Sequence, residues 1–195
     1  MFMSAFCTGG SAAMRLGTCA GSMFAEKLFS RAFDAACRSL WLDKGSAMRA
    51  NADRPMGIAP VIPDGEVVLG ESGAIVEVLL ARHGPGGLAR GPAAPDFASY
   101  LYWLHFANRT LQPIMARNMI VRRIDLPADH PVAASMRARL DLALRHVELR
   151  CAEAPYLAGA GFSAADIMSV FSLSAMRSFC PVDLGPYPQV RAYLQ

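Results

Sequence analysis

The chain has 195 residues, of which 53% are hydrophobic and 18% are charged, so it can bury one large or two small hydrophobic cores. Its net charge is +3, and its 19 lysines and arginines are spread along the sequence, which argues against a nucleic-acid surface. No apolar run reaches the about 18 residues that a membrane-spanning helix requires. We therefore expect a globular protein with neither nucleic acid nor membrane as a partner.

The cysteines and histidines form no metal-binding or disulfide pattern. The five cysteines include no C-x-x-C pair and have no metal-ligand spacing to the four histidines. An odd number of cysteines fits reduced thiols better than a disulfide framework. The N-terminus is rich in small residues, but Gly9-Gly10 and Arg15 interrupt its apolar segment, so it does not read as a signal peptide. We expect a cytoplasmic protein without a metal.

The first 54 residues give only weak patterns. Residues 1–6 are compatible with a short strand, and residues 22–42 have apolar side chains about one helical turn apart, which predicts a helix. No second β-branched strand stands between Gly17 and Arg54. The organisation of this segment therefore stays open.

From Pro55 onward the patterns are stronger. The apolar runs 58–62 and 66–69 flank a turn at residues 63–65, which predicts a β-hairpin. Pro60 lies inside the first run, where proline removes a donor and is normally confined to an edge or an irregularity. A cis Ala59-Pro60 bond would instead expose the backbone of Ala59 to a ligand.

A helix is expected to begin at Glu71-Ser72 and to end at Gly84. The free N–H groups and the positive dipole end of its first turn favour a carboxylate, and the Glu71 carboxylate can hold an ammonium group. An amino-acid head group carries both charges. The alternative is that Glu71 and Ser72 simply cap the helix.

The remainder of the chain predicts a linker and then helices. Residues 84–96 are rich in glycine and proline and read as a linker between domains. Helical spacing begins at Phe97, with a kink or break expected at Pro113, and a second long helix runs from near Pro131 toward Cys151.

Two further helices are expected near the C-terminus. The motif Ser163-Ala164-Ala165-Asp166 predicts a capping box, in which Ser163 caps the Asp166 amide and the Asp166 carboxylate returns to the Ser163 amide. Residues 180–188 read as a proline-containing loop, and residues 189–195 begin the last helix.

Three pieces in this order, P-M-G-I-A-P-V-I, D-G-E-V-V-L and E-S-G-A-I, resemble the second half of the thioredoxin-like domain of bacterial glutathione S-transferases. The resemblance covers residues 55–195, with residues 1–54 poorly matched. It implies an α/β plus all-α fold, with a thioredoxin-like glutathione-binding domain at residues 1–84 and an all-helical domain at residues 97–195. Residues 1–54 leave open whether the first domain is complete. The motif around Asp166 has a folding role in that family.

The resemblance also implies the residues that bind glutathione as a substrate. The backbone of Ala59, beside a cis Pro60, would pair with the cysteinyl part, and Glu71 with Ser72 would hold the γ-glutamyl end. A second-substrate pocket is implied at His105, Phe106 and Met115.

The catalytic residue is implied to be a hydroxyl or thiol after the first strand, where it would favour the thiolate of glutathione. Ser11 is the best candidate, with Cys7 and Thr8 as alternatives.

Three interpretations remain. The first is a homodimeric glutathione S-transferase that conjugates glutathione to a small electrophile. The second is a related binding or interaction protein without an intact catalytic segment. The third is a truncated or frame-shifted chain in which residues 55–195 keep the fold without activity.

Overall fold

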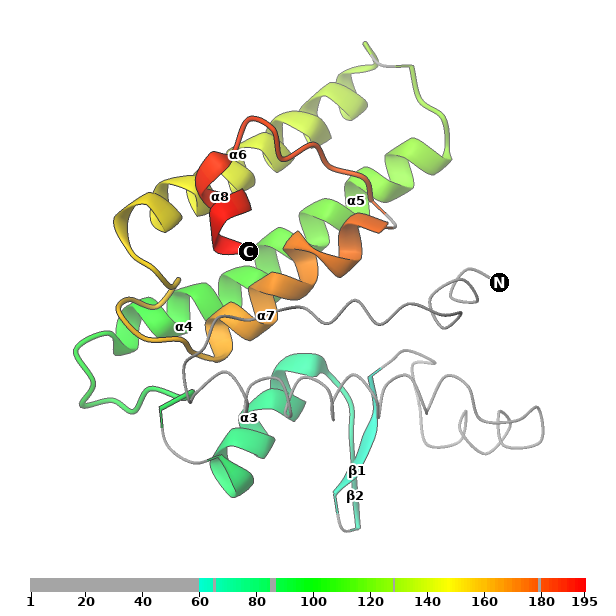
Figure 1. Ribbon diagram of the computed structural model, residues 1–195. Coiled ribbons are helices and arrows are strands. Elements are labelled where there is room, and N and C mark those ends of the chain that lie inside the picture. The colour runs from blue at the N-terminus through cyan, green and yellow to red at the C-terminus, as the bar shows by residue number, and fades with distance from the viewer. Residues whose placement is uncertain (1–59, 65, 85–86, 128, 179) are drawn as a thin grey trace.

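The computed structural model describes residues 60–195, apart from residues 65, 85–86, 128 and 179 (Figure 1). The expected strand at residues 1–6 and helix at residues 22–42 lie outside the described residues. So do four of the predicted site residues, which are Cys7, Thr8, Ser11 and Ala59.

The described part of the chain begins with a short antiparallel hairpin of β1 (Ile62–Asp64) and β2 (Val67–Leu69). Ile62 pairs with Leu69, and Asp64 pairs with Val67, so the predicted hairpin is confirmed. Its predicted bounds are wrong, because Pro63 and Asp64 lie in β1 and the chain reverses between Asp64 and Val67. Pro60 precedes β1 and has no N–H to donate, which explains why no ladder extends back to it.

Helix α3 (Ser72–His83) follows β2 directly, and its bounds agree with the sequence prediction. The N–H of Gly84 donates to the carbonyl of Leu80 at 3.1 Å and closes its last turn. Val76 and Leu80 are buried in one continuous core with side chains from the helices that follow. Helix α3 is therefore packed onto the helical half rather than separate from it.

The rest of the chain is helical (Figure 1). Its elements in order are α4 (Phe97–Phe106), the π-helical turn η1 (Ala107–Leu111), α5 (Gln112–Arg123), α6 (Pro131–Glu153), α7 (Ala164–Leu173), the 3₁₀ turn η2 (Ala175–Ser178) and α8 (Pro188–Tyr193). Helix α7 packs on α4, while α6 packs on α5 and on α8. Trp103, Leu111 and Val147 are among the buried side chains of this core.

The chain stays helical through Pro113, where the sequence predicted a kink or break. Helix α4 runs through η1 into α5, and Pro113 is the second residue of α5. Proline has no N–H to donate to the preceding turn, and the wider π turn before it makes room for the ring. The π turn therefore takes the place of the predicted break.

The segment predicted to be a linker is fixed to the helical half. Leu88 is buried, and its carbonyl accepts a hydrogen bond from the N–H of Ala164 at 2.9 Å. The guanidinium of Arg90 bonds the Asp96 carboxylate at 2.8 Å and the carbonyl of Gly161 at 2.9 Å. The segment thus joins α3 to the start of α7.

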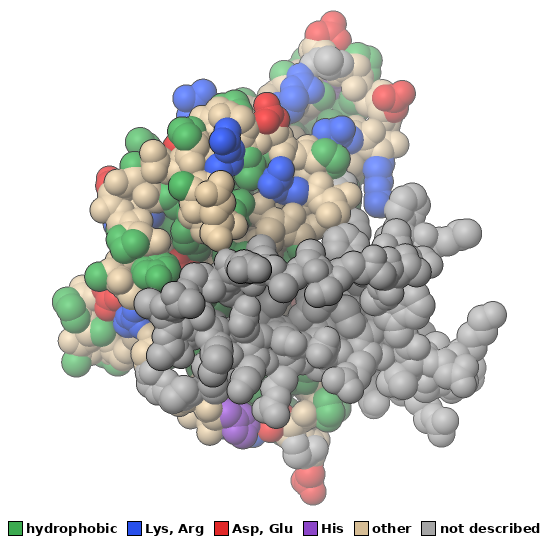
Figure 2. Space-filling model, viewed as in Figure 1, with side chains coloured by type: hydrophobic (Ala, Val, Ile, Leu, Met, Phe, Trp, Pro, Cys, Tyr) green, Lys and Arg blue, Asp and Glu red, His purple; other side chains and the backbone are tan. Residues whose placement is uncertain are grey.

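Basic side chains on the helical half are interspersed with hydrophobic, acidic and neutral ones on the face shown in Figure 2. Arg145 pairs with Asp141 at 2.7 Å, one turn earlier on α6. Within the described residues, no helix is both long and apolar enough to cross a membrane.

The Asp166 carboxylate is the most heavily bonded buried group of the helical half. Its side chain is fully buried and accepts from the N–H of Leu157 at 2.8 Å, the N–H of Ser163 at 2.9 Å and the hydroxyl of Tyr193 at 2.9 Å. The predicted capping box is confirmed. Burial raises the pKa of Asp166, and these hydrogen bonds act in the opposite direction. One carboxylate therefore ties α7 to α8 and to the loop before α7.

Replacing Asp166 by alanine should lower the free energy of unfolding by about 3 kcal/mol, because four donors lose their acceptor: the N–H of Leu157, the N–H and hydroxyl of Ser163, and the hydroxyl of Tyr193. Denaturant titration measures this loss. Asp129→Ala is the matched control, since Asp129 is exposed, and it should change stability by no more than about 0.5 kcal/mol. Equal stability of the two variants would contradict a structural role for Asp166.

Candidate functional site

The turn from β2 into α3 has an unusual backbone. Glu71 has φ 64° and ψ 113°, outside the conformations that side chains ordinarily allow. A non-glycine residue in such a conformation costs about 1–3 kcal/mol and is typical of binding and active sites. The Glu71 side chain is exposed and caps none of the amides that follow. Among the residues that the structure describes, the Glu71 carboxylate therefore has no partner at the start of α3.

The first turn of α3 can bind an anion. The first helical hydrogen bond runs from the N–H of Ile75 to the carbonyl of Glu71 at 2.9 Å. The N–H groups of Ser72, Gly73 and Ala74 precede it and have no acceptor within the helix. The first turn of α3 contains no acidic side chain. Its free amides and the positive dipole end favour a ligand carboxylate.

Pro60 lies at the same end of the hairpin as Glu71. The register that pairs Ile62 with Leu69 places Pro60 opposite Glu71 when it is continued by two residues. Pro60 and Glu71 thus lie at the open end of the hairpin, and Ser72 follows Glu71 directly. The state of the Ala59-Pro60 bond lies outside the described residues, and all four glutathione-binding residues stay a prediction.

The helical half reaches this site through Asn108 in η1. The Nδ2 of Asn108 donates to the Oγ of Ser72 at 3.4 Å. A Cβ atom built on Gly73 would lie 3.1 Å from the same nitrogen, so the missing side chain of Gly73 allows the approach. From the sequence alone, Asn108 reads either as an ordinary polar residue on a helix surface or as a polar group that orients the second substrate. No local signal reveals the contact, because its partners are 36 positions apart.

The residues predicted for the second-substrate pocket face different environments. His105 is exposed at the end of α4. Phe106 is buried, with its ring centroid 5.1 Å from that of Trp103. Met115 is 1% exposed and lies in the core. The burial of Met115 favours a packing role, and the pocket stays a prediction.

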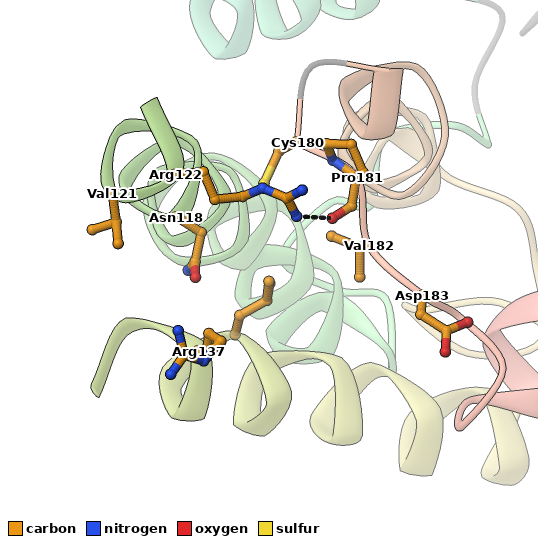
Figure 3. Close-up of a pocket in the computed structure, with 9 residues that line it drawn as sticks. Asn118, Val121, Arg122, Arg137, Cys180, Pro181, Val182 and Asp183 are labelled. Carbon is orange, nitrogen blue, oxygen red and sulfur yellow. Dashed lines mark hydrogen bonds between the residues drawn. The ribbon is translucent and has the colours of Figure 1, made fainter. Parts of the chain in front are cut away.

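A cavity of about 370 Å³ lies elsewhere, between α5, α6 and the segment after η2 (Figure 3). Arg122 and Arg137 lie on its two helical walls, and a guanidinium nitrogen of Arg122 donates to the carbonyl of Pro181 at 3.2 Å. None of the residues predicted for glutathione or the electrophile lines this cavity.

The described cysteines are poor nucleophiles. Burial raises the pKa of the Cys151 thiol to about 12 and also raises the pKa of Cys180. Both are therefore protonated at neutral pH, whereas a thiol attacks as the thiolate. In the described ranges no group of three or more metal-ligating side chains occurs.

Comparison with known proteins finds several with related sequence or structure. The chain is 23% identical over 154 residues to Glutathione S-transferase 3 of Schizosaccharomyces pombe, covering 72% of this chain and 63% of that protein. It is 29% identical over 118 residues to Glutathione S-transferase F14 of Arabidopsis thaliana, covering 58% of this chain and 46% of that protein. The crystal structure of a glutathione S-transferase from Actinobacillus pleuropneumoniae matches with a TM-score of 0.65 and 26% identity. The match covers 74% of this chain and 65% of that one. No family model matches the chain.

These comparisons define the class of fold. It is the glutathione S-transferase fold, as the sequence predicted. The described residues contain its helical half and, of its thioredoxin-like half, the hairpin of β1 and β2 and helix α3. The names of the relatives support the glutathione S-transferase family. The chain spans between 46% and 65% of the length of these three relatives. They come from a yeast, a plant and a bacterium, so the bacterial subgroup stays a prediction.

The backbone strain at Glu71 can be measured with two variants that both remove the carboxylate. Glycine adopts a positive φ without strain, whereas alanine keeps the Cβ atom that causes it. Glu71→Gly should therefore have a free energy of unfolding about 1 kcal/mol higher than Glu71→Ala. Denaturant titration of both variants tests this difference, and equal stabilities would contradict it.

Proposed function

We propose that this chain is a glutathione S-transferase that binds glutathione at the start of α3 and conjugates its thiolate to a small electrophile. The observation that carries the proposal is the strained Glu71 immediately before the free amides of α3, in a protein with the glutathione S-transferase fold. An exposed carboxylate next to an anion-binding helix start suits the zwitterionic head of the γ-glutamyl group.

Each described residue has a proposed role in binding. The hydroxyl and N–H of Ser72 bind the α-carboxylate of the γ-glutamyl group, because the helix start favours negative charge. The exposed carboxylate of Glu71 binds the ammonium group. The backbone beside Pro60 lies at the end of the hairpin nearest Glu71 and receives the cysteinyl part.

The reacting sulfur comes from glutathione itself. A free thiol has a pKa of about 8.5, so the site must stabilise the thiolate at neutral pH. We assign this task to the hydroxyl of Ser11. The bound thiolate then attacks an electrophilic carbon, and its bond to that carbon replaces the bond to the leaving group. Holding the two reactants together supplies much of the rate.

Millimolar glutathione should raise the melting temperature of the protein, because a ligand at about 100 times its Kd adds about 2.7 kcal/mol of stability. Ser72→Ala should reduce this shift, whereas Ser135→Ala on the exposed surface of α6 should leave it unchanged. Turnover is measured with 1-chloro-2,4-dinitrobenzene as a generic electrophile.

The two measurements separate the remaining interpretations. A shift together with turnover supports the transferase. A shift without turnover favours the binding protein without an intact catalytic segment. Absence of any shift would overturn both glutathione interpretations.

The proposed homodimer has a candidate surface on α6. Leu142 and Leu149 are 69% and 64% exposed, and their spacing of seven residues puts them on one face of the helix. His146 lies between them and bonds the hydroxyl of Tyr102, which is 51% exposed. A second copy of the chain would cover the two exposed leucines.

Leu149→Glu should convert the dimer to a monomer in analytical ultracentrifugation, because a charge would be buried at the interface. Ile124→Glu is the matched control, since Ile124 is 60% exposed at the end of α5, and it should remain dimeric. A monomeric wild-type protein would contradict the dimer, and a dimeric Leu149→Glu protein would exclude this face.

A further inference from the structure

The π turn η1 presents one polar side chain to the proposed glutathione site. Asn108 is half-buried, and the only described hydrogen bond of its side chain runs from Nδ2 to the hydroxyl oxygen of Ser72 at 3.4 Å. π-helical turns are rare and frequently occur at functional sites. The contact joins the helical half directly to the first turn of α3.

The direction of this hydrogen bond determines what the Ser72 hydroxyl can do. An amide nitrogen only donates, so the Ser72 oxygen is the acceptor. No other described residue bonds the Ser72 hydroxyl. Within the part of the chain that the structure describes, its proton has no acceptor and can be donated to a ligand. A carboxylate is the strongest acceptor that a ligand can offer it.

We propose that Asn108 is a positioning residue that holds the Ser72 hydroxyl as a donor and thereby selects ligands with an α-carboxylate at this position. The inference rests on the proposed function, because it concerns how the same site recognises glutathione. Asn108 acts through Ser72 and does not touch the reacting sulfur.

The contact between Asn108 and Ser72 also depends on the absence of a side chain at Gly73. The 3.1 Å between its hypothetical Cβ atom and Asn108 Nδ2 is tighter than an ordinary contact. An alanine at this position would displace the amide of Asn108 from Ser72. Gly73→Ala therefore perturbs the contact without removing any hydrogen-bonding group.

The test compares two ligands by isothermal titration calorimetry. One is glutathione, and the other is 4-aminobutanoyl-cysteinylglycine, which lacks only the α-carboxylate. Asn108→Ala should raise the Kd for glutathione about 3- to 10-fold and change the Kd for the analogue less than about twofold. A role in folding alone would affect both ligands equally.

A second substitution tests the polarity of the contact. Asn108→Asp is nearly isosteric, but its carboxylate would accept the proton of Ser72 and repel the α-carboxylate. It should raise the Kd for glutathione more than about 10-fold, whereas Gly73→Ala should resemble Asn108→Ala. Arg109→Ala is the control, since Arg109 is the exposed neighbour of Asn108, and it should bind like wild type. Thermal unfolding of each variant verifies that it is folded.

The outcomes distinguish this inference from the proposed function. Unchanged glutathione binding by Asn108→Asp would overturn the role of Asn108 while leaving the proposed function intact. Equal losses for glutathione and the analogue would also overturn the selection of the carboxylate. A wild-type protein that binds neither ligand would overturn the proposed function, and this inference with it.

Discussion

At Glu71 the backbone turns from strand to helix with φ 64°, and this turn determines where the first amides of α3 point. A glycine would adopt this conformation at lower cost. The glutamate instead places an exposed carboxylate next to the proposed glutathione site. The register of the hairpin brings Pro60 to the same end. A backbone constraint, rather than a cluster of catalytic side chains, thus organises the described part of the site.

The helical half contributes to this site as well as to the core. Asp166 ties α7 to α8, and α7 packs on α4, which leads into η1. Asn108 lies in η1 and donates a hydrogen bond to Ser72. The linker segment is bonded to the start of α7 through Leu88. The buried contacts of Asp166 and Leu88 therefore set the position of Asn108 relative to α3.

Features with local causes were predictable from the sequence. The bounds of α3 follow from the residues at its two ends, and the capping box at Ser163 needs only a spacing of three residues. The start of β1 was predicted incorrectly, and at Pro113 the chain continues through a π turn instead of breaking. The position of a proline does not decide either feature by itself. The start of β1 depends on strand pairing, and the path at Pro113 depends on the π turn before it. The contact of Asn108 with Ser72 depends on tertiary packing, so no sequence pattern reveals it.

The most direct test of the central claim is a glutathione titration followed by ¹⁵N-resolved NMR, because it reports which backbone amides meet the ligand. The account predicts saturable shifts at the amides of Ser72 and Gly73, in the first turn of α3. Shifts confined to the cavity between Arg122 and Arg137, or none at saturating glutathione, would contradict it.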